Sequence, residues 1–162
     1  MTLLASSHGR RAADGIRSPP VIYVLAFVAG VVSTLVFHQG LLALLHATGA
    51  SPMVAYVTTK VPPFGLPQFL STAFWGGVWA VVLVPLLARW ADSGRYWLAW
   101  LVAGAVLPTL VALFVVMPLK GKPLAAGWNP KIIAGALIVN AVWGVGAWLV
   151  LRSLQRLVQQ GV

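Results

Sequence analysis

Residues 62–87 read PPFGLPQFLSTAFWGGVWAVVLVPLL, and this stretch decides the fold of the chain. Two prolines and a glycine predict a turn, after which Pro67 can open a helix, where its missing N–H leaves no hydrogen bond unmade. About twenty residues without a charge follow, enough to cross a hydrocarbon core of ~30 Å at about 1.5 Å per residue. The stretch therefore predicts a transmembrane helix over residues 67–88.

The composition extends this prediction to the whole chain. Of its 162 residues, 60% are hydrophobic and 8% are charged, whereas a soluble domain normally carries about a quarter charged residues. The chain has no Cys, which excludes disulfides, thiolate metal sites and thiol nucleophiles. We therefore expect an all-α integral membrane protein with no cofactor and no metal.

Three further apolar stretches complete a predicted bundle of four transmembrane helices. The predicted helices cover about residues 21–45, 67–88, 96–117 and 132–151, within a transmembrane domain of residues 20–152. A flexible basic tail precedes it at residues 1–19, and a second tail follows at residues 153–162. Pro108 should kink the third helix. The segment 53–59 could form a short helix or a strand, and its periodicity does not decide between them.

The basic residues predict the orientation in the membrane. The formal net charge of +9 lies in the predicted tails and loops, where it points to lipid headgroups rather than to nucleic acid. All seven arginines fall on one side, at positions 10, 11, 17, 89, 95, 152 and 156, and all four lysines fall on the other. Because the side with more basic residues marks the cytoplasm, both termini are predicted to be cytoplasmic.

Small residues recur at helical spacing and predict where the helices touch. Membrane helices approach closely at such positions, because lipid offers no hydrophobic drive for their association. Thr72, Gly76 and Ala80 recur at every fourth position of the second helix. The predicted helix-packing residues are Gly30, Thr72, Gly76, Ala80, Ala136 and Gly144.

Two pairs of similar short sequence motifs are consistent with a duplicated two-helix hairpin. Residues 25–30 (LAFVAG) resemble residues 98–104 (LAWLVAG) with one inserted residue, and residues 73–76 (AFWG) resemble residues 141–144 (AVWG). Two copies that begin on the same side of the membrane would be related by an axis along the membrane normal. Chance similarity within a small apolar alphabet is the alternative.

Several short sequence motifs together resemble those of a known family. They are FHQG at 37–40, PPFGLPQ at 62–68, FWGGVW at 74–79, LPT at 107–109, PLKGKP at 118–123, AAGW at 125–128 and NAVWGVG at 140–146. The chain resembles an uncharacterised family of small four-span bacterial inner-membrane proteins. The resemblance covers most of the chain beyond the N-terminal tail and implies four spans in a bacterial cytoplasmic membrane. It implies no activity, cofactor or catalytic residue.

Four polar side chains within or beside the spans form the first candidate site. They are His38, Gln39, Gln68 and Asn140. A haem held between helices would need a second imidazole, and the other three predicted helices contain no His. We expect His38 to hydrogen-bond a carbonyl, Asn140 or Gln68, and a proton- or quinone-related role is the alternative. We expect Asn140 to bond a neighbouring helix.

Four lysines form the second candidate site. Lys60, Lys120, Lys122 and Lys131 share one side of the membrane, where the sequence offers no acid to cancel them, because Asp14 and Asp92 lie on the other side. Such a cluster could bind an anionic headgroup or solute. An ordinary solvated loop is the alternative.

Three functional classes fit these features. No paired carboxylates and no Ser-His-Asp set can be assembled, so an enzyme is not expected. The abundance of small-residue faces favours an accessory or assembly subunit that packs against a larger membrane complex or against itself. The alternatives are a small carrier or channel, and an anion- or lipid-binding membrane protein that uses the lysines.

Overall fold

The computed structural model describes residues 19–62 and 65–160, and it contains four helical segments long and apolar enough to cross a membrane. The predicted all-α fold with four membrane-spanning helices is confirmed. The tail predicted for residues 1–19 lies outside the described residues, apart from Pro19. The segments are α2 (Pro19–Ser33) with η1 (Thr34–His38) and α3 (Gln39–Ala47); α4 (Gln68–Leu86); α5 (Tyr96–Val111) with η3 (Ala112–Val116) and α6 (Met117–Leu119); and α7 (Pro130–Gln159). The short helices η2 (Ala88–Trp90) and η4 (Leu124–Trp128) lie in the connections.

The helix α7 extends beyond both predicted ends. It begins at Pro130 because Asn129 caps it: the Asn129 Oδ1 accepts hydrogen bonds from the backbone N–H groups of Lys131 (3.0 Å) and Ile132 (3.4 Å). Pro130 in the first turn has no N–H that would need a partner. The helix then continues unbroken to Gln159, so the residues from 153 onward, predicted as a tail, are helical up to that point.

The connection between α3 and α4 contains a short hairpin. Residues 50–59 form neither a helix nor a strand, so both alternatives predicted for residues 53–59 are wrong. The strands β1 (Lys60–Val61) and β2 (Leu66–Pro67) pair antiparallel. Carbonyl groups of the connection accept hydrogen bonds from the first N–H groups of α4, from Gln68 to Thr59 (2.9 Å) and from Phe69 to Val57 (3.1 Å). These bonds fix the start of α4 to the connection.

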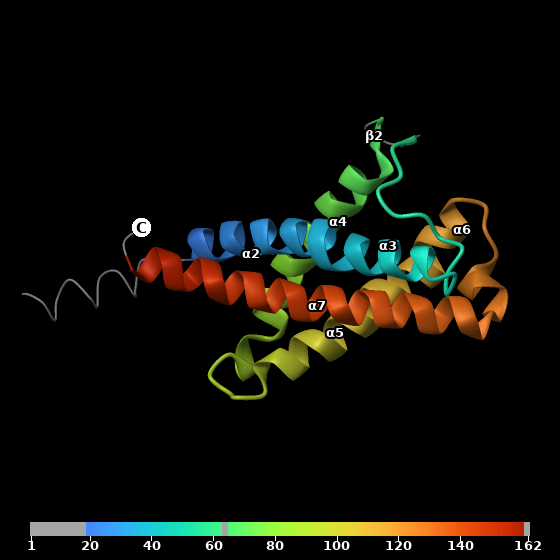
Figure 1. The fold of residues 1–162 in the computed structure, drawn as a ribbon. Helices are drawn as coiled ribbons and strands as arrows, with labels where there is room; N and C mark the ends of the chain where they lie inside the picture. The colour runs from blue at the N-terminus through green and yellow to red at the C-terminus, as the bar shows by residue number, and fades with distance from the viewer. Residues whose placement is uncertain (1–18, 63–64, 161–162) are drawn as a thin grey trace, which may run out of the picture.

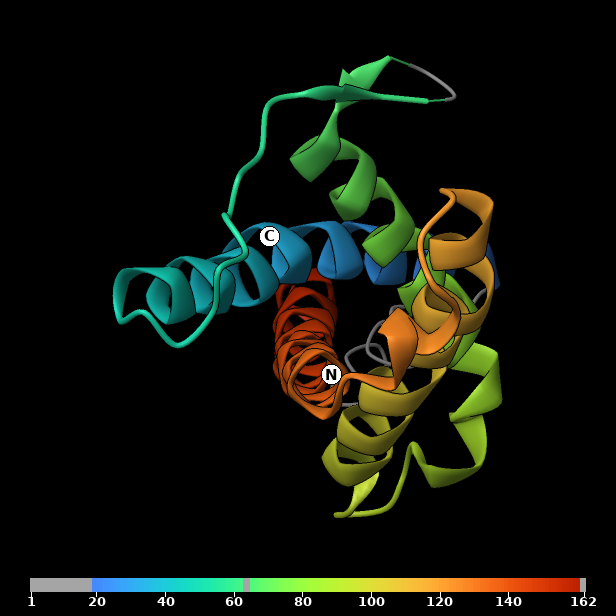
Figure 2. The same cartoon turned by 90° about the vertical axis from the view of Figure 1, so that its right-hand side faces the viewer.

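The four segments pack as two helical pairs. The helix α2 runs antiparallel to α7, and the two lie side by side (Figure 1). The helix α4 packs chiefly on α2, and α5 packs chiefly on α7, whereas α4 and α5 make only slight direct contact. Figure 2, which looks along α7, shows α4 rising away from α2 to the hairpin, on the flank of the bundle where α6 also lies.

Each pair crosses at two glycines. A Cβ atom added to Gly30 of α2 would clash with the carbonyl oxygen of Gly76 in α4. A Cβ atom added to Gly104 of α5 would lie 2.8 Å from the Cα atom of Gly144 in α7. Backbones can approach this closely only where neither residue carries a side chain, which is how small residues bring membrane helices together.

The crossings bear on the predicted duplication. The two pairs of similar motifs align Gly30 with Gly104 and Gly76 with Gly144. In the structure Gly30 packs on Gly76, and Gly104 packs on Gly144. The aligned glycines therefore make the same contact in both hairpins, which supports the duplicated hairpin over chance similarity.

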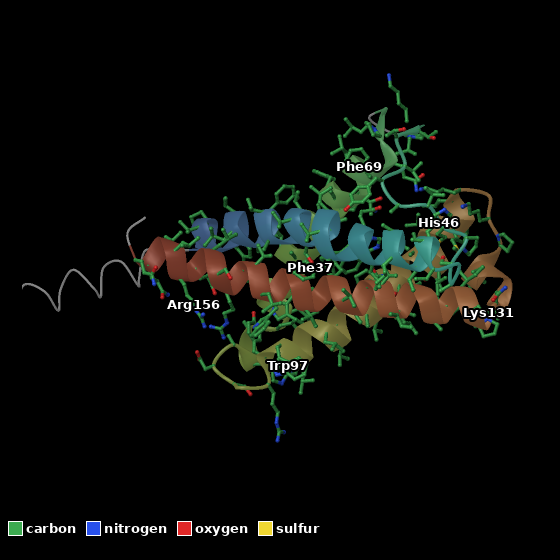
Figure 3. All side chains as sticks on the ribbon, viewed as in Figure 1. Phe37, His46, Phe69, Trp97, Lys131 and Arg156 are labelled. Carbon is green, nitrogen blue, oxygen red and sulfur yellow. The ribbon has the colours of Figure 1, made fainter. Side chains whose placement is uncertain are left out.

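The best-packed core lies at one end of the bundle. This end, here called the arginine end, carries Arg89, Arg95, Arg152 and Arg156, and the opposite lysine end carries Lys60, Lys120, Lys122 and Lys131. Figure 3 shows Arg156 and Lys131 at opposite ends. The core at the arginine end joins all four segments, and its largest fully buried side chains are Trp100, Leu83 and Leu151.

Arg152 ties α7 to the loop between α4 and α5 at this end. Its Nη2 donates to the Ala91 carbonyl at 2.9 Å, and its guanidinium carbon lies 5.4 Å from the centre of the Tyr96 ring. The guanidinium thus neighbours both a carbonyl and an aromatic ring, and these contacts hold the loop against α7.

The glycine crossings generate a prediction for two substitutions in the same helix. Gly144→Ala should lower the free energy of unfolding by about 1–3 kcal/mol, because the new Cβ would press on the Trp100 carbonyl. Gly135→Ala should be neutral or mildly stabilising, because nothing lies within 4 Å of the added atom and Ala favours a helix. Thermal unfolding in detergent measures both variants. Equal stability of the two would contradict the crossing.

Candidate functional site

A groove of about 960 Å³ opens between the two hairpins, mostly on the lysine side of the glycine crossings, and along α4 its lining passes Gly76 and reaches Val82. Its walls are α4 on one side and the segment from Pro108 to Lys120 on the other, and its floor is formed by η1 and α7. Three lining side chains in spanning helices are about half exposed: Trp75 (52%), Val82 (46%) and Val115 (48%). The groove therefore opens sideways, toward the lipid.

The groove lies along a part of α4 that its neighbours hold only at separate points. The middle of α4 is fixed on α2 at Gly76, and its beginning is fixed on the connection that carries the hairpin. Between these points α4 diverges from its neighbours, and its slight contact with α5 leaves the space beside it unfilled.

Three of the four predicted polar residues line this groove. His38, Gln68 and Asn140 are among its lining residues, whereas Gln39 is not. Gln39 is only 5% exposed, and its Oε1 accepts a hydrogen bond from the Tyr56 N–H at 2.8 Å. It follows His38 directly in the helix, so its side chain points about 100° away from that of His38.

One of the four predicted lysines reaches the groove. Lys120, at the end of α6, lines its outer end. Lys60, Lys122 and Lys131 are exposed and lie outside the groove lining. The structure thus separates the predicted lysine cluster into one groove residue and three surface residues.

The predicted helix-packing residues divide in a similar way. Gly30, Gly76, Ala80 and Gly144 are buried at helix crossings. Thr72 is half-buried and lines the groove instead, because α4 has already diverged from α2 one turn beyond Gly76. Ala136 is also half-buried.

Two π-helical turns flank the groove. η1 contributes Thr34 and His38 to its floor, and η3 contributes Ala112, Val115 and Val116 to one wall. A π-turn widens a helix and redirects its side chains, and such turns are frequent at functional sites. At Pro108, where a kink is predicted, α5 continues as a helix, and it becomes π-helical from Ala112.

Most polar groups of the floor are already hydrogen-bonded within the protein. The Asn140 Nδ2 donates to the Thr109 Oγ1 at 2.8 Å, which joins α7 to α5. The hydroxyls of Thr34 and Thr72 each donate to the carbonyl four residues earlier, both at 2.9 Å. The Trp143 Nε1 donates to the Gly30 carbonyl at 3.2 Å. These donors are therefore not free for a ligand.

His38 is the exception on the floor. Its Nδ1 is buried and has no hydrogen-bond partner among the described residues. The expected bond to a carbonyl, to Asn140 or to Gln68 is not made at this nitrogen. The Nε1 atoms of Trp100 and Trp148 also lack a partner and lie outside the groove lining, so His38 is a candidate for contact with a ligand because its ring lines the groove.

Tyr56 fastens the connection to the π-turn η1. Its hydroxyl donates to the Leu35 carbonyl at 2.7 Å, its N–H donates to Gln39, and its ring meets Phe69 edge to face. Its φ of +52° is uncommon for a residue other than glycine. The three contacts stabilise this backbone conformation of Tyr56. They also fix the connection that lies at the outer end of the groove.

Sequence reasoning missed several residues of this site. Trp75, Trp79, Thr109 and Tyr56 were not among its candidates. Thr109 could not be found, because its bond to Asn140 depends on how α5 packs against α7. The two tryptophans carried a signal, since they stand one and two turns beyond Ser71 on the same flank of α4.

Comparison of the chain with models of protein families, with curated proteins and with solved structures gives no match.

The Tyr56 contacts generate a prediction for the connection. Tyr56→Phe removes the hydroxyl bond to the Leu35 carbonyl and should speed amide hydrogen exchange in residues 50–59 roughly two- to tenfold, as the loss of one hydrogen bond implies. Tyr23→Phe is the matched control, because Tyr23 is an exposed tyrosine on α2. Equal exchange in the two variants, measured by mass spectrometry, would mean that the hydroxyl does not hold the connection.

Proposed function

We propose that this protein holds one lipid-soluble molecule in the groove between α4 and the segment 108–120. The observation that carries the proposal is the groove itself, about 960 Å³ in volume and open sideways among membrane-spanning helices. Ligand pockets of proteins usually measure about 300–1,000 Å³, so the groove suits a small molecule or a lipid. No catalysis is assigned to it, since the chain has no Cys and no acid in its spans.

A ligand with a hydrocarbon chain suits the groove best. Three polar groups of the groove already donate hydrogen bonds within the protein: the hydroxyls of Thr34 and Thr72 and one N–H of Asn140. Mainly apolar surface is left in the groove. Burial of such surface contributes about 25 cal/mol per Å². Polar groups remain chiefly at His38 and at the outer end, so the expected ligand is a chain with a polar head.

A carrier or channel has less support. Both would need a path to the arginine end, where Trp100, Leu83 and Leu151 are packed with at most 2% of their surface exposed. Along α4 the groove reaches Val82, and the side chains of this core fill the space between the helices beyond it. The described conformation therefore favours a binding site that is open at one end only.

An accessory or assembly subunit, which the sequence favoured, also has less support. That expectation rested on more small-residue faces than a four-helix bundle needs. Gly30, Gly76, Gly104 and Gly144 all pack against one another inside the chain. The small residues at the closest helix contacts are thus used within the chain, and we favour the lipid ligand.

We further propose that the protein lies in a bacterial cytoplasmic membrane with the arginine end in the cytoplasm. The resemblance of its sequence motifs supports the membrane. The orientation is supported by the seven arginines predicted on one side, three of them in the N-terminal tail outside the described residues, against four lysines on the other.

Alkaline phosphatase fusions test this orientation. A fusion after Gly121 should be active, because the loop that follows α6 would be outside the cytoplasm, and a fusion at the C-terminus should be inactive. The reverse pattern would overturn the orientation.

Filling the groove tests the binding function. Val115→Trp should reduce the amount of lipid that co-purifies with the protein several-fold, because the indole would occupy space that the chain of the ligand needs. Val102→Trp is the matched control, since Val102 is 56% exposed on α5 and does not line the groove. Native mass spectrometry counts the bound molecules. Unchanged binding in folded Val115→Trp protein would refute the proposal.

A further inference from the structure

We infer that the ligand of the groove is an anionic phospholipid, with its phosphate at Lys120 and its chains directed toward Val82. This inference rests on the proposed function and adds the charge and the direction of the ligand. It follows from the charge at the outer end, the length of the groove and the position of His38.

The charge at the outer end is positive and not cancelled. Lys120 is the one lysine among the described residues that line the groove. Lys60 precedes the lining residue Val61, and Lys122 follows Lys120 by two residues, so both add to the same positive potential. The only acid among the described residues is Asp92, which lies in the loop at the arginine end. Lysines near the membrane surface attract anionic lipids.

The length of the groove suits a lipid chain rather than a compact solute. Along α4 the lining residues run from Gln68 to Val82. Fourteen residues of helix rise about 21 Å at about 1.5 Å each. Half of a hydrocarbon core is about 15 Å thick, so the groove can take a headgroup at Gln68 and Lys120 together with the chain beneath it.

His38 lies between these two ends. It stands one helical turn on the lysine side of Thr34, which packs on Gly76, whereas Gln68 stands two turns from Gly76 in the same direction. A glycerophospholipid carries ester oxygens just below its phosphate. These oxygens can accept a hydrogen bond from the imidazole, which a plain hydrocarbon chain cannot do.

The selectivity for headgroups tests this inference. Full-length protein is offered equal amounts of phosphatidylglycerol and phosphatidylcholine with identical chains, and native mass spectrometry reports the ratio of the bound lipids. Wild-type protein should retain the anionic lipid at least fivefold over the zwitterionic one. Lys120→Gln should bring the ratio close to one. Lys131→Gln, which removes a charge at the same end but outside the groove, should leave the ratio unchanged.

The outcomes separate this inference from the proposed function. If Val115→Trp lowers the binding of both lipids while Lys120→Gln leaves the ratio unchanged, the anionic head is refuted and the lipid groove stands. If Val115→Trp lowers neither, the lipid groove itself is refuted. Inorganic phosphate alone is the third arm. If it raises the unfolding temperature of lipid-free wild-type protein and not of Lys120→Gln, the site takes a free anion, and the lipid is refuted.

Discussion

The close approach of two glycine pairs is the constraint on which the rest of the structure depends. In lipid, apolar side chains gain little by facing each other, so helices are held where their backbones can touch. Gly30 with Gly76 and Gly104 with Gly144 provide two such points. Each glycine pair holds the two helices of one hairpin together near their middle. The contact between α2 and α7 then joins the two hairpins. The parts of the helices beyond these points are free to pack or to diverge.

The two ends of the bundle use this freedom differently. At the arginine end large side chains such as Trp100 and Leu83 fill the space between the helices, and Arg152 fastens the loop below them. At the lysine end the chain must accommodate a long connection and a hairpin before α4. Tyr56 and the first N–H groups of α4 hold this connection away from α5. The groove is the space left between the packed side chains of the arginine end and the connection held at the lysine end.

The sequence predicted the fold well and the site in part, for physical reasons. Apolar length and charge bias are local properties, so the four spans could be read directly. Helix spacing placed Gly76 at a crossing, yet it could not show that Thr72, one turn away, faces the groove, because that depends on where α4 diverges. Gln39 and His38 are adjacent in sequence but their side chains point about 100° apart, and only packing reveals which of them meets the groove. The bond between Asn140 and Thr109 likewise depends on tertiary contact.

The two AxWG motifs differ in what their tryptophans do. Trp143 in the second hairpin reaches across to the Gly30 carbonyl and closes that side of the bundle. Its counterpart Trp75 stays half exposed and lines the groove. Its equivalent target would be the carbonyl of Gly104, which lacks the usual helical donor because Pro108 has no N–H. If the hairpins arose from one ancestral unit, the groove marks the place where the copies diverged, so a cavity could evolve by the loss of one contact from a symmetric, closed precursor.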